Sequence, residues 1–307
     1  MIALQDLHFL VTLATSPSFA IAARRLDVSA PHVTQKLKRL EASLGVSLFE
    51  RGRQPRLTPQ GRLIAERGGE VLRQMRALEE SLQNSREELG GQLNIVAPIG
   101  FGEKRLAPLL GEYRRRHPHV TLDLTLSDRP AWEGNPRQPD IMFYIGDLHQ
   151  STLYRTLIAP TRRLLCAAPA YLASMPPLHR PEDLAHHHCI VLRENDEDCT
   201  LWRLRHLASG EESSIRVSPS LTSNVADAVK QWALQGLGII HRSEWDLQPE
   251  LAAGTLVPVL PDYAPPAVDI VALMGSSRES RPRRINHFIT FVQERLRKEL
   301  GGPKVQP

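Results

Sequence analysis

The sequence lacks the features that direct a chain into or across a membrane. Its 307 residues contain no uninterrupted apolar run of about eighteen, the length that a helix needs to span a bilayer. The first ten residues, MIALQDLHFL, contain neither a basic segment nor a small-residue cleavage site, so they do not fit a signal peptide. We therefore expect a cytoplasmic protein without a membrane partner.

Cysteine is scarce, and its placement fits neither a disulfide framework nor a metal site. The three cysteines are Cys166, Cys189 and Cys199, an odd number without a Cys-x-x-Cys pair. The best metal candidate is the run His186–Cys189, but four consecutive residues cannot all converge on one ion, and no second ligand cluster follows. We predict ordinary thiols and no bound metal.

Catalytic constellations are also missing. No nucleophile with a base and no cofactor fingerprint occurs in a suitable context. Gly236-Leu237-Gly238 resembles half of a dinucleotide loop, but it precedes an expected strand instead of opening a helix after one, which favours a turn. We predict that the protein is not an enzyme and has no cofactor.

Basic charge is concentrated near the N-terminus. Residues 20–62 hold nine Lys and Arg against three Asp and Glu, an excess of +6, whereas the whole chain carries only +4. The remainder therefore sums to −2, and the local excess favours contact with nucleic acid over a generally basic surface. The length gives a prior of two domains, and 41% hydrophobic residues suits a globular chain.

Two short helices joined by a turn are predicted within this basic stretch. Phe19, Ala23 and Leu26 recur at helical spacing, and Ser29 is a natural N-cap for a second helix with Pro31 in its first turn. The apolar stripe of that second helix consists of Val33, Leu37, Leu40 and Leu44. An earlier helix, with Leu4, Leu7, Leu10, Val11 and Ala14 at helical spacing, is expected to pack behind this helix-turn-helix.

The outer face of the second helix is polar and basic, with no acid before Glu41. A solvated helical hairpin is the alternative, but such a face favours DNA binding. The segment 46–57, with Gly52 and Pro55, then suits a two-stranded wing, for which a solvated loop stays open as the alternative. The predicted DNA contacts are Ser29, Pro31, His32, Thr34, Gln35, Lys36, Lys38 and Arg39 on the helix, and Arg51, Arg53 and Arg56 on the wing.

A long helix is predicted from Thr58-Pro59 to the helix-ending pair Gly90-Gly91, about 48 Å at 1.5 Å per residue. Its apolar positions alternate at spacings of four and three, although Gly68 and Ser85 weaken the seam. Packing on its own domain is the alternative to a dimer, in which two reading helices would address a two-fold symmetric operator. The predicted dimerisation residues are Ile64, Val71, Met75, Leu78, Leu82 and Leu89.

From residue 91 onward, buried-type strands alternate with helices, which predicts an α/β domain with mostly parallel sheets. About 210 residues is generous for one open sheet, so we expect two lobes with a cleft between them. The expected strands are 93–97, 120–126, 140–145, 163–168, 188–192, 238–241 and 255–260, with a helix near 103–117.

Several motifs occur together in one order: the paired alanines Ala22-Ala23, VSAPHVTQKLKRLE, LGVSLFER and LTPQG. In them the chain resembles the LysR-type transcriptional regulators. The resemblance implies a winged helix-turn-helix domain at 1–57, a linker helix at 58–90, and an effector domain at 91–307 of periplasmic-binding-protein type II. Its lobe I would comprise 93–160 and 267–300, and its lobe II 161–266.

The resemblance also implies that a small-molecule effector binds between the lobes. The implied effector-binding residues are Pro98, Ile99, Gly100, Phe101, Thr161, Arg193, Asn195, Ser223 and Asn224. Helices opening near Gly102 and Asn224 would present free backbone N–H groups, and Arg193 could add a charged contact, so an organic anion is expected.

The chain departs from the family pattern at both sites. Pro98-Ile99-Gly100 stands where many members place a hydroxyl, and Ala30, His32 and Gln35 replace the family's common residues on the reading helix. The first departure removes one expected hydroxyl contact to the effector, and those on the reading helix predict an atypical operator. A packing or phosphate contact remains open as the alternative role of His32.

The function expected from the sequence is sequence-specific regulation of transcription, switched by the effector. A cysteine-based redox sensor of the same fold is the alternative, although Cys189 lies in an apolar strand and the acids beside Cys199 would raise its pKa. The expected partners are double-stranded DNA and further copies of the chain in a homodimer or homotetramer, with RNA polymerase as a further candidate.

Overall fold

The computed structural model describes residues 2–50, 56–72, 74–75, 89–129, 139–146, 152–195, 197–278 and 281–300. The chain divides into two compact units. The first comprises 1–89, 131–139 and 278–283, and the second comprises 90–130, 140–277 and 284–307. The finer domain limits given above stay predictions.

The first unit contains the predicted helix-turn-helix, with α1 at Leu4–Ala14, α2 at Phe19–Arg25 and α3 at Ala30–Leu44. Val33 and Leu37 are buried in its core, and Leu40 and Leu44 pack against it. This confirms the predicted stripe of α3. Ser29 is the N-cap of α3, as predicted, and its Oγ accepts a hydrogen bond from the backbone N–H of His32 at 3.4 Å.

Helix α1 has two apolar faces instead of the single predicted stripe. Phe9, Leu10 and Leu13 point into the helix-turn-helix core. On its other side, a Cβ added at Gly68 would lie 2.7 Å from Leu7 and 2.9 Å from Val11. Gly68 therefore lets the following helix approach α1 closely, and the glycine packs within its own domain.

The wing begins and ends on a two-stranded base, where Phe49 and Leu57 form an antiparallel bridge. The carboxylate of Glu41 holds this base from α3, because its Oε1 accepts hydrogen bonds from the backbone N–H groups of Leu48 at 2.6 Å and Phe49 at 3.2 Å. Thr58 caps α4, Pro59–Leu63, through the N–H of Gly61 at 3.0 Å. Arg51 and Arg53 lie outside the described residues.

The helix after the wing contains a π-helical turn. Helix α4 continues into η1, Ile64–Gly68, and then into helical residues 69–72 and 74–75. The predicted long helix therefore contains a π turn at this point, which inserts an extra residue into the predicted seven-residue repeat. Leu78 and Leu82 lie outside the described residues.

Lobe I of the second unit is built on a five-stranded sheet with the order β2-β1-β3-β13-β4. Helices α7 and α11 pack against each other through Tyr113, whose ring lies 5.0 Å from that of Phe288. The elements are β1 at Gly91–Pro98, α6 at Ile99–Phe101, η2 at Gly102–Leu106, α7 at Ala107–Arg116, β2 at Val120–Ser127, β3 at Ile141–Ile145, β4 at Tyr154–Thr161, β13 at Val268–Met274 and α11 at Arg283–Leu300.

Lobe II contains a second five-stranded sheet, β11-β5-β10-β6-β9, and a small sheet, β12-β7-β8. Its strands are β5 at Arg163–Ala167, β6 at Cys189–Leu192, β7 at Leu201–His206, β8 at Glu212–Arg216, β9 at Pro219–Ser223, β10 at Ile239–Ser243, β11 at Val257–Pro258 and β12 at Tyr263–Ala264. Its helices are α8 at Pro169–Ala173, η3 at Pro181–His186, α9 at Ala226–Leu234 and α10 at Glu244–Ala253.

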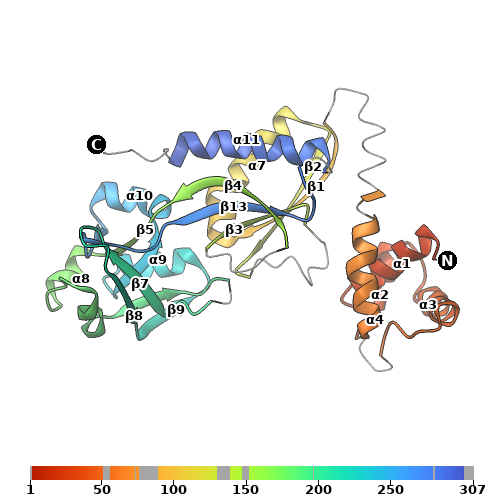
Figure 1. Ribbon diagram of the computed structural model, residues 1–307, viewed down its shortest axis with the longest axis horizontal. Coiled ribbons are helices and arrows are strands. Elements are labelled where there is room, and N and C mark those ends of the chain that lie inside the picture. The colour runs from red at the N-terminus through yellow and green to blue at the C-terminus, as the bar shows by residue number, and fades with distance from the viewer. Residues whose placement is uncertain are drawn as a thin grey trace. The chain divides into compact units, whose positions relative to one another are not determined.

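The expectation of mostly parallel sheets is wrong, because both main sheets are mixed. β1 pairs in parallel with β2 and β3, but β13 is antiparallel to β3 and β4, and β5 is antiparallel to β10 and β11. The chain enters lobe II after β4 at Arg162 and returns through β13, so the outgoing and returning strands run in opposite directions (Figure 1). Within the described residues, no helix is long and apolar enough to cross a membrane.

Candidate functional site

The outer face of α3 is exposed, as a DNA-reading helix requires. Ser29, His32, Gln35 and Arg39 lie on the surface, and the core stripe faces the opposite way. The other exposed predicted contacts of this segment are Pro31, Thr34 and Lys38. The stripe fixes the orientation of these side chains, because residues three and four apart share one helix face.

One predicted DNA contact is engaged elsewhere. The ammonium of Lys36 lies 3.0 Å from the carboxylate of Asp6 and 4.8 Å from the ring centre of Phe9, both on α1. Lys36 therefore ties α3 to α1, and its contact with DNA stays a prediction. Arg56, at the end of the wing, is exposed.

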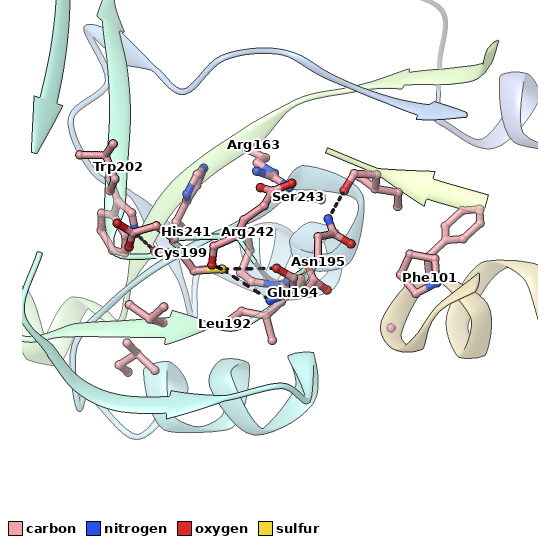
Figure 2. A pocket seen from close by; sticks show the side chains of 18 of the residues that line it. Phe101, Arg163, Leu192, Glu194, Asn195, Cys199, Trp202, His241, Arg242 and Ser243 are labelled. Carbon is pink, nitrogen blue, oxygen red and sulfur yellow. Dashed lines mark hydrogen bonds between the residues drawn. The ribbon is translucent and has the colours of Figure 1, made fainter. Parts of the chain in front are cut away.

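A cavity of about 120 Å³ lies between the ends of strands from both lobes. Several hydrogen bonds join the lobes around it. Asn195 donates to the carbonyl of Ile145 at 3.1 Å, and the hydroxyl of Tyr144 donates to Glu197 at 2.9 Å. Arg105 donates to the carbonyl of Trp245 at 2.9 Å. The lobes are therefore closed around a small chamber, shown in Figure 2.

Of the predicted effector contacts, four line this cavity and five do not. The lining ones are Pro98, Gly100, Phe101 and Asn195, and the others are Ile99, Thr161, Arg193, Ser223 and Asn224.

The side chains that miss the cavity have other positions or partners. Asn224 donates to the carboxylate of Asp128 at 2.7 Å, and the hydroxyl of Ser223 accepts from the N–H of Val225 at 3.0 Å. Thr161 is buried with its hydroxyl turned to the carbonyl of Arg162, and Arg193 is exposed. Arg193 therefore lies outside this cavity, and its contact with an effector stays a prediction.

Sequence reasoning missed the residues that give the cavity its charge. Arg163 at the start of β5 and His241 and Arg242 on β10 line it, together with Trp202 and Trp245. Arg163 was available as a basic residue at the start of a predicted strand. Nothing in the pattern indicated that β5 and β10 are neighbours, which is what brings Arg163 and His241 together.

Arg163 is the cavity's cation whose guanidinium has no ion-pair partner among the described residues. Within the described part of the chain, no carboxylate lies within ion-pair distance of its guanidinium, whereas the buried Arg242 lies 2.8 Å from Asp246. The side chains of Arg163, His241 and Arg242 appear together in Figure 2. A guanidinium without a carboxylate partner in a small chamber is suited to an anionic ligand.

His241 presents a second polar group without a partner, its ring nitrogen Nε2. Its Nε2 is buried and has no hydrogen-bond partner among the described residues. Burial, with the charges of Arg163 and Arg242, lowers the pKa of His241 to about 3, so the ring is neutral near pH 7. Its ring lies 5.7 Å from that of Trp202. A buried, unpaired nitrogen at a cavity wall calls for a ligand atom or a water.

Two of the three acidic residues that line the cavity, Glu197 and Asp198, have side-chain partners. Glu197 accepts from Tyr144, and Asp198 lies 2.6 Å from Arg216 and accepts from the hydroxyl of Thr200. These contacts hold the pKa of Asp198 near about 2. Glu194, half-buried, shares backbone contacts with the thiol of Cys199.

The cysteines are not activated. Burial raises the pKa of Cys166 and Cys189 to about 12, and burial likewise raises that of Cys199, with Glu194 and Glu197 adding to the effect. A raised pKa keeps a thiol in its less nucleophilic form. No group of three or more potential metal ligands occurs among the residues that the structure describes.

Comparison with known families matches both units of the chain. Residues 4–62 match the family model described as "Bacterial regulatory helix-turn-helix protein, lysR family", and residues 86–297 match "LysR substrate binding domain". The chain belongs to the LysR family of transcriptional regulators. The architecture of a helix-turn-helix domain followed by a two-lobed α/β effector domain is the one predicted from the sequence, and the family is not one of enzymes.

Individual relatives agree with this assignment. The HTH-type transcriptional activator TtdR of Escherichia coli strain K12 is 34% identical over 97% of this LysR-type chain and 95% of its own. The regulator DmlR of the same strain is 32% identical over 86% and 85%. The solved structure of CrgA from Neisseria meningitidis, a LysR-type regulator, superposes with a TM-score of 0.59 at 28% identity, covering 97% of this chain and 99% of that one.

Proposed function

We propose that this LysR-type regulator reads DNA through the exposed face of α3 and the wing, and that a small organic anion switches its activity. The anion binds in the closed cavity between the lobes and favours the closed state by its differential affinity for it. Lobe closure would change the relative placement of the two DNA-binding arms of a dimer. The protein acts as a switch on transcription.

The observation that carries the effector assignment is that the guanidinium of Arg163 and the buried Nε2 of His241 line one cavity and have no ion-pair or hydrogen-bond partner among the described residues. Two unused polar groups in one enclosed chamber are costly unless a ligand or water satisfies them. The chamber is smaller than the roughly 300–1,000 Å³ typical of drug-sized ligands, which favours a small effector.

A thermal-shift screen of the full-length protein against small organic acids tests this function. A ligand that binds only the folded state raises the melting temperature by mass action, and Arg163→Gln should abolish the shift. Operator fragments selected from genomic DNA should then show a changed footprint when the same acid is added. If none of the organic acids in the screen raises the melting temperature, the effector assignment is contradicted.

Redox sensing remains the alternative trigger, but the raised pKa of all three thiols speaks against it. Treatment with diamide separates the two triggers. We expect DNA binding to be unchanged by diamide, with the cysteines reacting only after unfolding. Oxidant-dependent DNA binding that Cys199→Ser removes would favour the alternative.

We further propose that the chain works in the cytoplasm as a homodimer or homotetramer on a two-fold symmetric operator, and that it contacts RNA polymerase. LysR-type membership and the exposed apolar side chains of Val71 and Met75 on the linker helix support self-association. Sedimentation of the protein with and without operator DNA measures the stoichiometry, and a monomer on a single half-site would contradict it.

A further inference from the structure

A second cavity adjoins the effector chamber. Its volume is about 330 Å³, against about 120 Å³ for the inner chamber. Both cavities are lined by Arg163 and His241, and also by Glu197, Asp198 and Leu201. Because the same side chains border both spaces, the two cavities are direct neighbours.

The outer cavity has its own cation and an apolar side. Arg203, on β7, lines it together with Pro266 and Val268, which lie where the chain returns to lobe I. Leu201 lies two residues before Arg203 on the same strand and borders both cavities. The two cavities together are therefore bordered by the guanidinium groups of Arg163 and Arg203 and by the apolar side chains of Leu201, Pro266 and Val268.

The carboxylates along this path do not neutralise Arg163. Asp198 forms its ion pair with Arg216, and Glu197 accepts its hydrogen bond from Tyr144. Besides the carboxylate of Glu194, which also lines the inner chamber, the acids on this path have side-chain partners. A ligand carboxylate would meet a guanidinium and a His241 nitrogen that have no ion-pair or hydrogen-bond partner in the described residues. The charge pattern favours acidic groups on the ligand.

We propose that the two cavities form one elongated site for a linear organic dicarboxylate. One carboxylate lies at Arg163 and His241, the carbon chain passes Leu201 and Val268, and the second carboxylate lies at Arg203. This inference rests on the proposed effector site and specifies the ligand class that the site takes. Arg203 is thereby the residue that distinguishes dicarboxylates from monocarboxylates.

The strand geometry provides a matched control. Arg203 and Arg205 are both exposed and lie two residues apart on β7, so their side chains leave the same face of the strand. Only Arg203 lines the cavity. Arg203→Gln and Arg205→Gln therefore remove the same charge from the same face, and differ in whether the charge borders the proposed site.

The experiment is calorimetric titration of the full-length protein with acetate, succinate, glutarate, adipate and glutamate. We expect the best dicarboxylate to bind at least about tenfold more tightly than acetate, as one added charge-assisted contact allows. Arg203→Gln should reduce that advantage to within about threefold and leave acetate binding unchanged. Arg205→Gln should keep the full advantage, and Arg163→Gln should weaken all the acids. Unchanged melting temperatures verify that the variants fold.

The outcomes separate this inference from the function on which it rests. If acetate and the dicarboxylates bind equally well, or if Arg203→Gln retains the advantage, the dicarboxylate site is overturned and the small-anion effector site stands. Tighter binding of glutamate than of glutarate would also overturn it, because the ammonium would then be recognised. If none of the acids binds, both the inference and the anionic effector are wrong.

Discussion

The ammonium of Lys104 lies 2.7 Å from the carboxylate of Asp246, an ion pair that joins the two lobes of the effector domain. Lys104 is on η2 of lobe I and also bonds to Asp227 on α9. Asp246, whose side chain is fully buried on α10, is at the same time paired with Arg242 at 2.8 Å. Arg242 lines the effector cavity, so one carboxylate connects the cavity wall to the contact between the lobes.

Replacing Lys104 should loosen this connection. We expect Lys104→Met to lower the stability of the effector domain by about 1–3 kcal/mol, because Arg242 is then the one charged partner of the buried Asp246 within the described residues. Lys104→Arg should retain most of the stability. Calorimetric melting of the full-length variants measures the difference, and equal melting of Lys104→Met and the wild type would contradict the role of this pair.

Asp246 should also make stability depend on pH. Burial alone would raise its pKa, but Arg242 and Lys104 lower it overall. A carboxyl with a lowered folded-state pKa stabilises the fold above its ordinary pKa of 3.8, and this stability is lost as the pH falls through the folded-state value. Melting temperatures from pH 7 downward should therefore fall less steeply for Asp246→Asn than for the wild type. Melting temperatures that fall equally steeply with pH in the wild type and in Asp246→Asn would contradict this role of Asp246.

Gly61 has a packing role that can be separated from helix propensity. A Cβ at Gly61 would lie 2.1 Å from the carbonyl oxygen of Leu48, so Gly61→Ala must displace the base of the wing. We expect a loss of about 1–3 kcal/mol in the DNA-binding unit, as in other overpacked sites. Gly111 in α7 has no atom within 4 Å of its added Cβ, so Gly111→Ala should instead stabilise its helix by about 0.5–1 kcal/mol. Thermal melts of both variants make the comparison.

Two neighbouring residues of α3 should respond differently to replacement by alanine. Gln35 is exposed on the outer face, so Gln35→Ala should relax base preference in a selection of bound DNA fragments, with little change in melting temperature. Lys36 is paired with Asp6, so Lys36→Ala should lower stability by about 0.5 kcal/mol and change the selected sequence less. Identical selected sequences for wild type and Gln35→Ala would refute base reading by this residue.

Local patterns predicted the DNA-binding unit well, and non-local contacts explain what they missed. The stripe Val33 to Leu44 and the cap at Ser29 depend on residues within a few turns, so periodicity reveals them. The cavity joins Arg163 to His241, nearly eighty residues apart in the sequence, through the pairing of β5 with β10. Strand direction was likewise missed, because the return of the chain through β13 is a property of the whole topology.

The linker helix provides a final prediction, because its π turn changes which residues face outward. Leu63 and Val71 are eight residues apart, and the extra residue of η1 brings them close to one face. The exposed fractions are 56% for Leu63, 47% for Val71 and 39% for Met75. Ile64, in contrast, packs against the helix-turn-helix core. Leu63, Val71 and Met75 are therefore available for a partner helix.

Accordingly, Val71→Asp should shift the oligomer toward smaller species in sedimentation velocity while the unit keeps its melting temperature, because a charge would enter the apolar seam. Ile64→Ala should instead leave the oligomeric state unchanged. It should lower stability by about 1–2 kcal/mol through lost core packing at a half-buried site. If Ile64→Ala dissociates the oligomer and Val71→Asp does not, the dimer seam follows the uninterrupted heptad that includes Ile64. The prediction that the π turn moves the seam to Leu63, Val71 and Met75 would then be wrong.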